Sequence, residues 1–339
     1  MRYTLELARS GLRVPRKFAQ ALIARDLNGW LRVQFLGAAL HTGLLHALTQ
    51  PRTIQELAAV MSASDVGLLR SLLEAGAALG EFRNDGGRWR LRGARAKALA
   101  DAAMDPMAGI LEEAVAYDTD VYLALGRRLK GEKPGDYLAE NAEVVARASR
   151  LAEPVLGALV RDVVRRHRSA SVLDVGCGTG IYLRHAAAAS KTTTGVGVDF
   201  RPEVVAMAQR NLESWRISNR FSTRRADLRD LPADLSGPWD LVLLFQNIYY
   251  FPPEERPGVL ARLRALAPNG VVVVASAVSD ANDPIGSHLD IVLRSTLGNY
   301  PLPVTEEIRS ELTSAGFSRV DVRRLAPRQP LRAFVARSG

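Results

Sequence analysis

The chain has 339 residues, enough for two domains, and its 47% apolar and 24% charged residues are typical of a globular protein. Its single cysteine, Cys177, excludes a disulfide framework and favours a reducing, cytoplasmic location. No segment is long and apolar enough to span a membrane, and the N-terminal stretch lacks the layout of a signal peptide.

The chain is basic, with a formal net charge of +9. Only five of its 45 basic residues are lysine, and the arginines are spread along the sequence without the interleaved aromatic residues of a single-strand-binding groove. An arginine- and alanine-rich composition raises the pI without creating a binding site. Nucleic acid is therefore an alternative partner and not the favoured one.

Residues 1–100 are predicted to form a helical, winged-helix-like domain. Thr53 begins "TIQELAAVM" with Glu56 three residues on, which is the spacing of a capping box at a helix start. A second helix follows and ends at Gly80, and "EFRNDGGRWRLR" then alternates apolar and polar residues around Asp85 and Gly86 as a β-hairpin does. Residues 101–168 are predicted to be a helical linker and active-site cover.

Residues 169–339 are predicted to form an α/β domain. The expected strands are "SVLDV", "TTGVGVDF", "RFSTRRADL", "WDLVLLFQ" and "GVVVVASAV", and helices lie between them. This alternation implies a mostly parallel sheet with right-handed crossovers. The last two strands, "FSRVDVRRL" and "LRAFVAR", are joined by a short link and must be antiparallel. We therefore expect a Rossmann-like, seven-stranded, mostly parallel sheet with an antiparallel last strand.

The first strand runs into Asp174 and then into Gly176, Gly178 and Gly180. Glycines that follow a strand and open a helix permit a tight turn and close approach of a ligand to the backbone. The spacing D-x-G-x-G-x-G differs from the G-x-G-x-x-G of a dinucleotide site. An acid before the turn disfavours a pyrophosphate and suits a ligand with a cationic amino group.

Two further acids follow the next two strands. Asp199 ends "GVGVDF" about 20 residues past the turn, where a carboxylate can bind both hydroxyls of a ribose. Asp227 follows the third strand and can accept a hydrogen bond from an exocyclic adenine amine. Because open α/β sheets bind ligands at the carboxyl ends of their strands, Asp174, Asp199 and Asp227 are expected to line one crevice.

The motifs "LDVGCGTG", "GVDF", "ADL" and "WDLVLLFQNIYYF" resemble those of class I S-adenosylmethionine-dependent methyltransferases. The resemblance covers about half of the chain and implies S-adenosylmethionine as the cofactor. No metal site is expected, because His41 and His46 are five residues apart on an apolar helix, the wrong spacing for two ligands on one face. Gly176 and Gly178 are then expected near the methionine part, Asp199 at the ribose, and Asp227 with Leu228 at the adenine. The full set of expected cofactor-binding residues is Asp174, Gly176, Cys177, Gly178, Gly180, Asp199, Phe200, Asp227, Leu228 and Gln246.

The front region resembles the N-terminal dimerisation domain of small-molecule O-methyltransferases, which implies a homodimer. In those enzymes a catalytic His follows the fourth strand, but here the matching stretch is "FQNIYYFPPEE". Tyr249 stands where the His would be, and a tyrosine is a poor base at neutral pH. Tyr249 and Tyr250 can instead orient the acceptor, or contact a cationic one through their ring faces.

Another residue can also supply the base. His288, expected in a lid loop after the fifth strand, is one candidate, and Glu113 and Asp118 are others. The favoured function is methylation of a small molecule at N, C or O, in specialised metabolism. The alternatives are a nucleic-acid methyltransferase and a non-enzymatic winged-helix regulator that senses a ligand. Salt-dependent DNA binding would separate both from the favoured function.

Overall fold

The computed structural model describes residues 17–137, 141–327 and 329–338. They divide into two compact units, which are described separately. The first takes the described residues up to Tyr122 together with Asn141–Arg150, and the second takes residues 123–137 and the described residues from Leu151 on. Helix α8 (Tyr117–Arg128) begins in the first unit and ends in the second.

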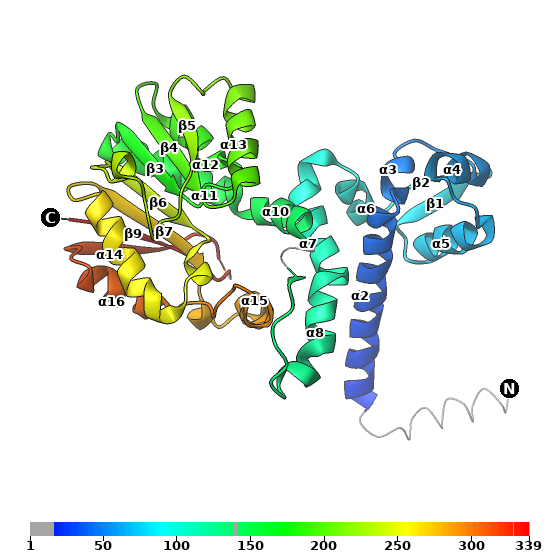
Figure 1. The fold of residues 1–339 in the computed structure, drawn as a ribbon. Helices are drawn as coiled ribbons and strands as arrows, with labels where there is room; N and C mark the ends of the chain where they lie inside the picture. The colour runs from blue at the N-terminus through cyan, green and yellow to red at the C-terminus, as the bar shows by residue number, and fades with distance from the viewer. Residues whose placement is uncertain (1–16, 138–140, 328, 339) are drawn as a thin grey trace. The chain divides into compact units, whose positions relative to one another are not determined.

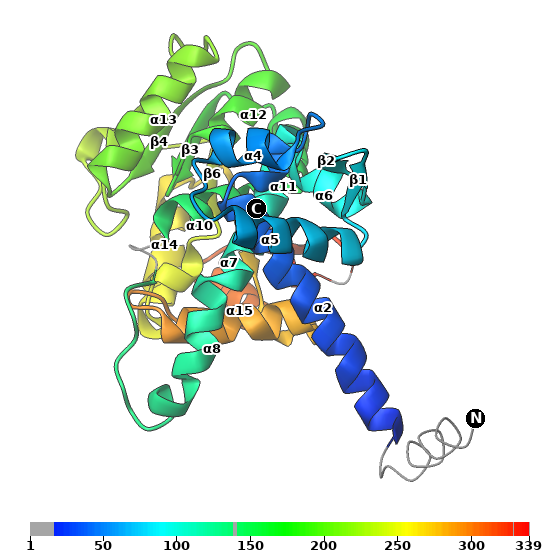
Figure 2. The ribbon, with the colours of Figure 1, turned by 90° about the vertical axis from the view of Figure 1, so that its right-hand side faces the viewer.

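The first unit is mainly helical and holds one β-hairpin (Figures 1 and 2). Its elements in chain order are α2 (Lys17–His41), α3 (Leu44–Ala47), α4 (Ile54–Met61), α5 (Val66–Ala78), β1 (Phe82–Asp85), β2 (Arg88–Leu91), α6 (Ala94–Leu99), the 3-10 turn η1 (Ala102–Met104), α7 (Asp105–Val115) and α10 (Ala142–Ser149).

The predicted capping box and hairpin are both confirmed. The Thr53 side chain accepts from the Glu56 N–H, and the Glu56 carboxylate accepts from the Thr53 N–H at 2.8 Å. Strands β1 and β2 pair antiparallel from Phe82 opposite Leu91 to Asp85 opposite Arg88, which leaves Gly86 and Gly87 as the turn. Figure 2 shows α4, α5 and this hairpin together, in the order of a winged helix.

The second unit is a doubly wound α/β domain (Figure 1). Its helices are α11 (Glu153–His167), α12 (Ile181–Ala189), α13 (Pro202–Ser214), α14 (Arg256–Leu266), α15 (Pro284–Ser295) and α16 (Thr305–Ser314). Its strands are β3 (Ser171–Val175), β4 (Thr194–Asp199), β5 (Phe221–Arg225), β6 (Leu241–Phe245), β7 (Val271–Ala277), β8 (Arg319–Arg324) and β9 (Leu331–Arg337). Short 3-10 turns are η2 (Arg150–Ala152), η3 (Ala233–Leu235), η4 (Ile248–Tyr250), η5 (Pro253–Glu255) and η6 (Ser279–Ala281).

The seven strands lie in the order β5-β4-β3-β6-β7-β9-β8. Strands β3 to β7 are parallel, and β9 is antiparallel to both β7 and β8. The predicted sheet and its antiparallel last strand are therefore confirmed. The strand order reverses between β3 and β6, and this switch point is where open sheets of this kind bind ligands.

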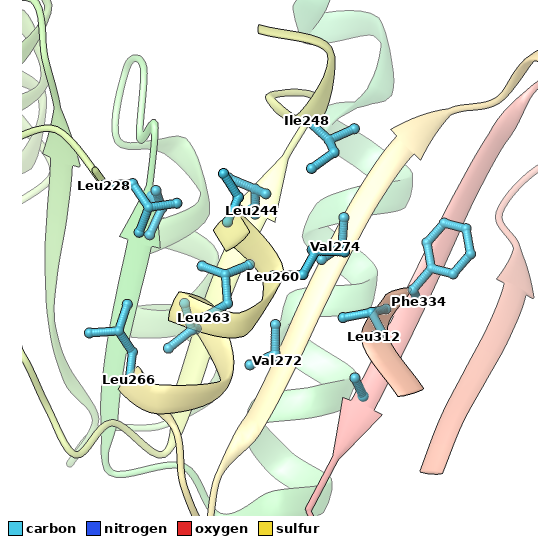
Figure 3. Packing of buried hydrophobic residues seen from close by; sticks show 14 of the residues in the cluster. Leu228, Leu244, Ile248, Leu260, Leu263, Leu266, Val272, Val274, Leu312 and Phe334 are labelled. Atoms are coloured by element: carbon cyan, nitrogen blue, oxygen red, sulfur yellow. The ribbon is translucent and has the colours of Figure 1, made fainter. Parts of the chain in front are cut away.

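Helices cover both faces of the sheet because its central strands are apolar on both sides. On one face, Leu260 and Leu263 of α14 pack with Val272 and Val274 of β7 (Figure 3). On the other face α11 and α12 pack against the alternate strand residues, for example Val160 against Leu243 within one cluster. The β3 strand lies between these two layers, so its carboxyl end is held rigidly.

Candidate active site

The glycine turn joins β3 to α12. Gly176, Gly178 and Gly180 all have positive φ angles, of 69°, 52° and 78°, which glycine adopts without strain. The N–H groups of Gly176 and Cys177 both donate to the carbonyl oxygen of Val198, at 2.8 and 2.9 Å. These bonds fix the turn against the end of β4, so the turn lies at the switch point of the sheet.

Asn247 braces the turn from the end of β6 and was not predicted from the sequence. Its Nδ2 donates to the carbonyl oxygens of Phe245 at 2.8 Å and Gly176 at 3.2 Å. A Cβ on Gly176 would lie 2.4 Å from this Nδ2, so the position needs glycine for space as well as for its φ angle. A polar residue two positions after the end of the buried strand "LVLLF" was the one signal for it in the sequence.

Asp174 lies at the end of β3 with its side chain buried, and the residue is 1% exposed. Its Oδ2 has no hydrogen-bond partner within the described part of the chain. Burial, reinforced by the negative charge of Asp199, raises the pKa of Asp174 to about 7. A buried carboxyl with an unused oxygen fits a ligand that brings a cationic hydrogen-bond donor.

Asp199 ends β4, the strand next to β3. Its Oδ1 accepts a hydrogen bond from the N–H of Arg201 at 3.1 Å, which fixes the carboxylate at the tip of the strand. The neighbouring residue Phe200 is 64% exposed. A fixed carboxylate next to an exposed aromatic ring suits a ribose and the base attached to it.

Asp227 lies two residues beyond β5, and its Oδ1 accepts from the N–H of Arg229 at 2.9 Å. The Arg229 guanidinium lies 3.6 Å from its Oδ2. The side chain of Leu228 is buried in the core cluster beneath α14, so the backbone of this residue is the part left for a ligand.

The last two expected cofactor residues have mainly structural contacts. Gln246 follows β6 with a φ of 54°, which is unusual for a residue other than glycine, and its Oε1 accepts from the N–H of Ala277 at 3.1 Å. Cys177 is buried, and a Cβ on Gly197 would lie 2.8 Å from its Sγ. Burial and the charge of Asp174 raise the pKa of Cys177, so this thiol is not a nucleophile.

Tyr249 and Tyr250 lie side by side in η4, with ring centroids 5.0 Å apart. Tyr249 packs against Ala277, Leu293 and Leu302. Burial, the largest effect, raises the pKa of Tyr250, on which the charges of Arg201 and Asp199 act in opposite directions. Tyr250 is therefore the tyrosine on which the charge of Asp199 acts, whereas Tyr249 packs against residues that include Leu293 of α15.

His288 lies in helix α15 and not in the lid loop that was predicted. The Asp283 Oδ1 accepts from the N–H groups of Ile285 and Gly286, at 2.9 and 3.0 Å, and Pro284 occupies the first turn. These are start signals that turn the segment into a helix. The ring of His288 is half-buried on that helix.

The two acids of the helical middle lie in the first unit. Burial raises the pKa of Glu113, on α7, to about 8, and the charge of Asp118 adds to the effect. A carboxylate with so high a pKa is a stronger base than an ordinary one. In residues 17–137, 141–327 and 329–338, no group of three or more His, Cys, Asp or Glu has the arrangement to hold a metal ion.

Within the second unit, then, a glycine turn at the switch point is flanked by a buried acid and followed by a fixed acid on the next strand. This fold and site define an S-adenosylmethionine-dependent methyltransferase domain. Residues 172–270 match a family described as "Methyltransferase domain", which confirms that prediction. The unused Asp174 oxygen fits the amino group of this cofactor, and Asp199 fits its ribose.

Two curated relatives illustrate the range of matches. The chain is 32% identical over 74 residues to rRNA N(6)-adenosine-methyltransferase metl-5 of Caenorhabditis elegans. The aligned segment covers 22% of this chain and 35% of that protein. The chain thus spans about a third of that relative. It is also 25% identical over 339 residues to 3-hydroxy-5-methyl-1-naphthoate 3-O-methyltransferase of Streptomyces sahachiroi, which covers 94% of this chain and 96% of that protein.

Solved structures share the fold of the whole chain. The structure of mitomycin 7-O-methyltransferase matches with a TM-score of 0.79 and 19% identity, over 96% of this chain and 99% of that chain. The N,N-8-amino-8-demethyl-D-riboflavin dimethyltransferase of Streptomyces davawensis matches with a TM-score of 0.73 and 22% identity, over 96% and 100%. The helical first unit therefore belongs to the shared architecture, as well as the sheet. No helix in the described ranges is long and apolar enough to cross a membrane.

Proposed function

We propose that the protein transfers a methyl group from S-adenosylmethionine to a small-molecule acceptor in specialised metabolism. The buried Asp174 carboxyl, with an oxygen left unpartnered at the glycine turn, carries this proposal. When bound, the cofactor supplies a methyl group on a positively charged sulfur, which an acceptor lone pair can displace. The protein's part is to hold the cofactor and the acceptor in line.

The acceptor is proposed to present an oxygen or an amine. The Streptomyces sahachiroi relative is named as an O-methyltransferase of a naphthoate, and one of the solved structures with this fold is a dimethyltransferase of an amino-riboflavin. An amine acceptor needs little help from a base. Such an acceptor suits this site, because Tyr249 follows the fourth strand of the domain in the place of a base. Tyr249 and Tyr250 can present their ring faces to a cationic acceptor.

A hydroxyl acceptor needs a base, and His288 on α15, in the same unit as the glycine turn, is the proposed one. Comparing the pH dependence of turnover in the wild-type protein and in a His288→Gln variant tests this role.

We also propose that the chain acts as a homodimer through α2. The helix exposes a stripe of apolar side chains at helical spacing: Ile23 at 59%, Leu27 at 55%, Trp30 at 55% and Leu31 at 50%. Monomeric proteins rarely expose such a continuous apolar patch. A second copy is the proposed occupant. The single, buried Cys177 accords with a cytoplasmic protein.

Calorimetric titration with S-adenosylmethionine, S-adenosylhomocysteine and NADH tests the cofactor assignment. We expect micromolar affinity for the first two and none for NADH. Asp199→Ala is expected to abolish binding of both sulfur ligands, whereas Glu203→Ala, an exposed acid on the following helix, is the matched control and is expected to bind normally.

Either of two outcomes contradicts the proposal. Failure of the wild-type protein to bind either sulfur ligand rules out the methyltransferase function and favours a ligand-sensing regulator. Normal affinity in Asp199→Ala removes this acid from the site. Tight, salt-dependent binding of DNA or RNA would favour a nucleic-acid substrate, for which the net charge of +9 is the supporting observation.

A further inference from the structure

Of the three acids expected at the site, Asp227 follows a strand at the edge of the sheet. Strand β5, which precedes it, is first in the strand order and pairs with β4 on one side, whereas β3 and β4 each lie between two strands. Asp227 lies in a loop of residues 226–230, which we call the adenine loop after the base expected there. A side chain on such a loop needs anchors outside the sheet to keep its direction.

Backbone hydrogen bonds close the adenine loop and join it to β4. The N–H of Ala226 donates to the carbonyl oxygen of Asp199 at 3.1 Å. The N–H of Asp230 donates to the carbonyl oxygen of Asp227 at 3.0 Å, and the Asp227 Oδ1 accepts from the N–H of Arg229. One carboxylate oxygen of Asp227 is thereby tied to the loop itself. The direction of the carboxylate then depends on how the loop is held against the rest of the domain.

The Arg229 side chain holds the loop against the segment that follows β6. Its Nε donates to the Glu255 Oε2 at 3.0 Å, and its guanidinium carbon lies 4.7 Å from the centroid of the Phe251 ring. Phe251 is buried in the core cluster beneath α14 and directly follows η4. The same guanidinium lies 3.6 Å from the Asp227 Oδ2. One side chain therefore joins the acid to a carboxylate of η5 and to a fixed aromatic ring.

Packing between the loop and the start of α14 is incomplete, so polar side chains span the space. An open cavity of about 270 Å³ has Leu228 and Arg229 of the loop among its lining residues, together with Glu255, Val259 and Arg262. Arg229 reaches across to Glu255, and Arg262 reaches back to donate to the carbonyl oxygen of Leu228 at 3.3 Å. Because exposed ion pairs stabilise a fold by little, this bridge is expected to fix a direction more than to hold the fold together.

We propose that Arg229 is a positioning residue for the adenine base of the cofactor. It acts through Asp227, whose carboxylate it keeps directed at the exocyclic amine of the base, while Glu255 and the Phe251 ring fix Arg229 in turn. The inference rests on the proposed function, since it requires that S-adenosylmethionine binds at this site. It adds to base recognition a side chain that belongs neither to the glycine turn nor to the three acids.

The test compares two ligands that differ at the base. S-adenosylhomocysteine presents an exocyclic amine, which donates, and S-inosylhomocysteine presents a carbonyl oxygen at the same position. Because a carboxylate only accepts, we expect the wild-type protein to bind S-adenosylhomocysteine about 10-fold to 100-fold more tightly, the value of one hydrogen bond to a charged group. Asp227→Asn offers an amide that can accept or donate, and it is expected to abolish most of this preference. Calorimetric titration measures both affinities.

Two substitutions test the bridge itself. Arg229→Gln keeps the backbone N–H that binds Asp227 but removes the guanidinium, and Glu255→Ala removes an anchor of that guanidinium. We expect each to lower the preference about threefold to tenfold by weakening S-adenosylhomocysteine binding, and to change the affinity for S-inosylhomocysteine less than twofold. In an Asp227→Asn background, Arg229→Gln is expected to change the preference less than twofold, because it acts through that acid.

Arg224→Gln is the matched control. Arg224 lies on β5, its side chain is 47% exposed against 48% for Arg229, and it pairs with Asp234 at 2.8 Å. This variant loses an equivalent exposed ion pair, so it is expected to keep the wild-type preference. The melting temperature of each variant without ligand shows whether folding is affected.

An equal loss of affinity for both ligands in Arg229→Gln would overturn the inference, since it would mean that the residue only supports the loop. An unchanged or increased preference in that variant would overturn it as well. If the wild-type protein binds both ligands equally well, Asp227 does not recognise the amine, and the inference fails while cofactor binding stands. If the wild-type protein binds neither S-adenosylmethionine nor S-adenosylhomocysteine, the proposed function fails together with the inference.

Discussion

Asp174 and Asp199 end neighbouring parallel strands, and the charge of Asp199 adds to burial in raising the pKa of Asp174 to about 7. Asp174 lies opposite Gly197, two residues before Asp199, so the two carboxyl groups share one edge of the sheet. With a pKa of about 7, Asp174 is about half protonated at neutral pH when no ligand is bound. A cationic ligand favours the charged form of Asp174 and displaces the proton.

The affinity for S-adenosylmethionine is therefore expected to rise between pH 6 and pH 8. The pKa of Asp174 is about 7, whereas burial raises the pKa values of Cys177 and Tyr182 well above their usual ranges. Below that pH a proton must leave before the ammonium group can pair. Calorimetry at three pH values measures the effect, and Asp174→Asn, which cannot ionise, should give a weak and pH-independent affinity.

Asp174 is also expected to lower the stability of the ligand-free protein. Its pKa is about 7 in the folded state and 3.8 ordinarily, so the folded state binds the proton more tightly. The free energy of unfolding therefore falls as the pH rises from 3.8 to about 7. Asp174→Asn removes this loss and is expected to raise the melting temperature at pH 8 by roughly 3–10 °C, with a smaller gain at pH 5. A variant less stable than the wild type at pH 8 would contradict this.

Gly176 and Gly178 offer a matched pair of substitutions. Both have a positive φ, but a Cβ at Gly176 would lie 2.4 Å from Asn247 Nδ2, whereas a Cβ at Gly178 meets nothing within 4 Å among the described residues. Gly176→Ala adds a clash to the backbone strain, so we expect it to destabilise the fold by about 2–4 kcal/mol, and Gly178→Ala by about 1 kcal/mol. Chemical denaturation measures both. Equal losses would mean that Asn247 moves aside without cost.

The two tyrosines are expected to differ in function. The charge of Asp199 acts on the buried hydroxyl group of Tyr250, so we expect Tyr250→Phe to weaken S-adenosylmethionine binding about threefold to tenfold through loss of one polar contact. Tyr249 packs toward α15, and Tyr249→Phe should leave cofactor affinity unchanged and lower only the turnover of whichever acceptor a screen identifies. Titration of both variants decides this. The reverse pattern would exchange their roles.

Much of this site could be predicted because its signals are local. The strand "SVLDV", the glycines after it and the acid of "GVDF" lie within thirty residues, and the parallel order of the sheet brings their ends together. The strands themselves are apolar runs flanked by turn residues, which specify a buried sheet. The antiparallel pair at the end was predictable from the short link between its strands.

The remaining residues depend on contacts between distant segments. Asn247 braces Gly176 from the turn after β6, 71 residues further along the chain. His288 was misplaced for a different reason: Asp283 and Pro284 were signals for a helix start and were not used.

The exposed stripe on α2 leads to a prediction about assembly. If a second copy covers Ile23, Leu27 and Trp30, the wild-type protein is a dimer in solution, and Leu27→Asp with Trp30→Asp buries two charges in the interface. Such unpaired charges cost several kcal/mol, which is enough to give a monomer at micromolar concentration. Size-exclusion chromatography with light scattering measures the mass.

Val60→Asp is the matched control for that experiment. Val60 is an exposed apolar residue on α4, at 56%, away from the α2 stripe in sequence. It should leave the dimer intact. A double α2 variant that stays dimeric would place the interface elsewhere on the chain, and a monomeric wild-type protein would leave the stripe for another partner. If the monomeric double variant still binds S-adenosylmethionine with unchanged affinity, the cofactor site is complete within one chain. We expect this result because the proposed cofactor-binding residues all lie in the second unit.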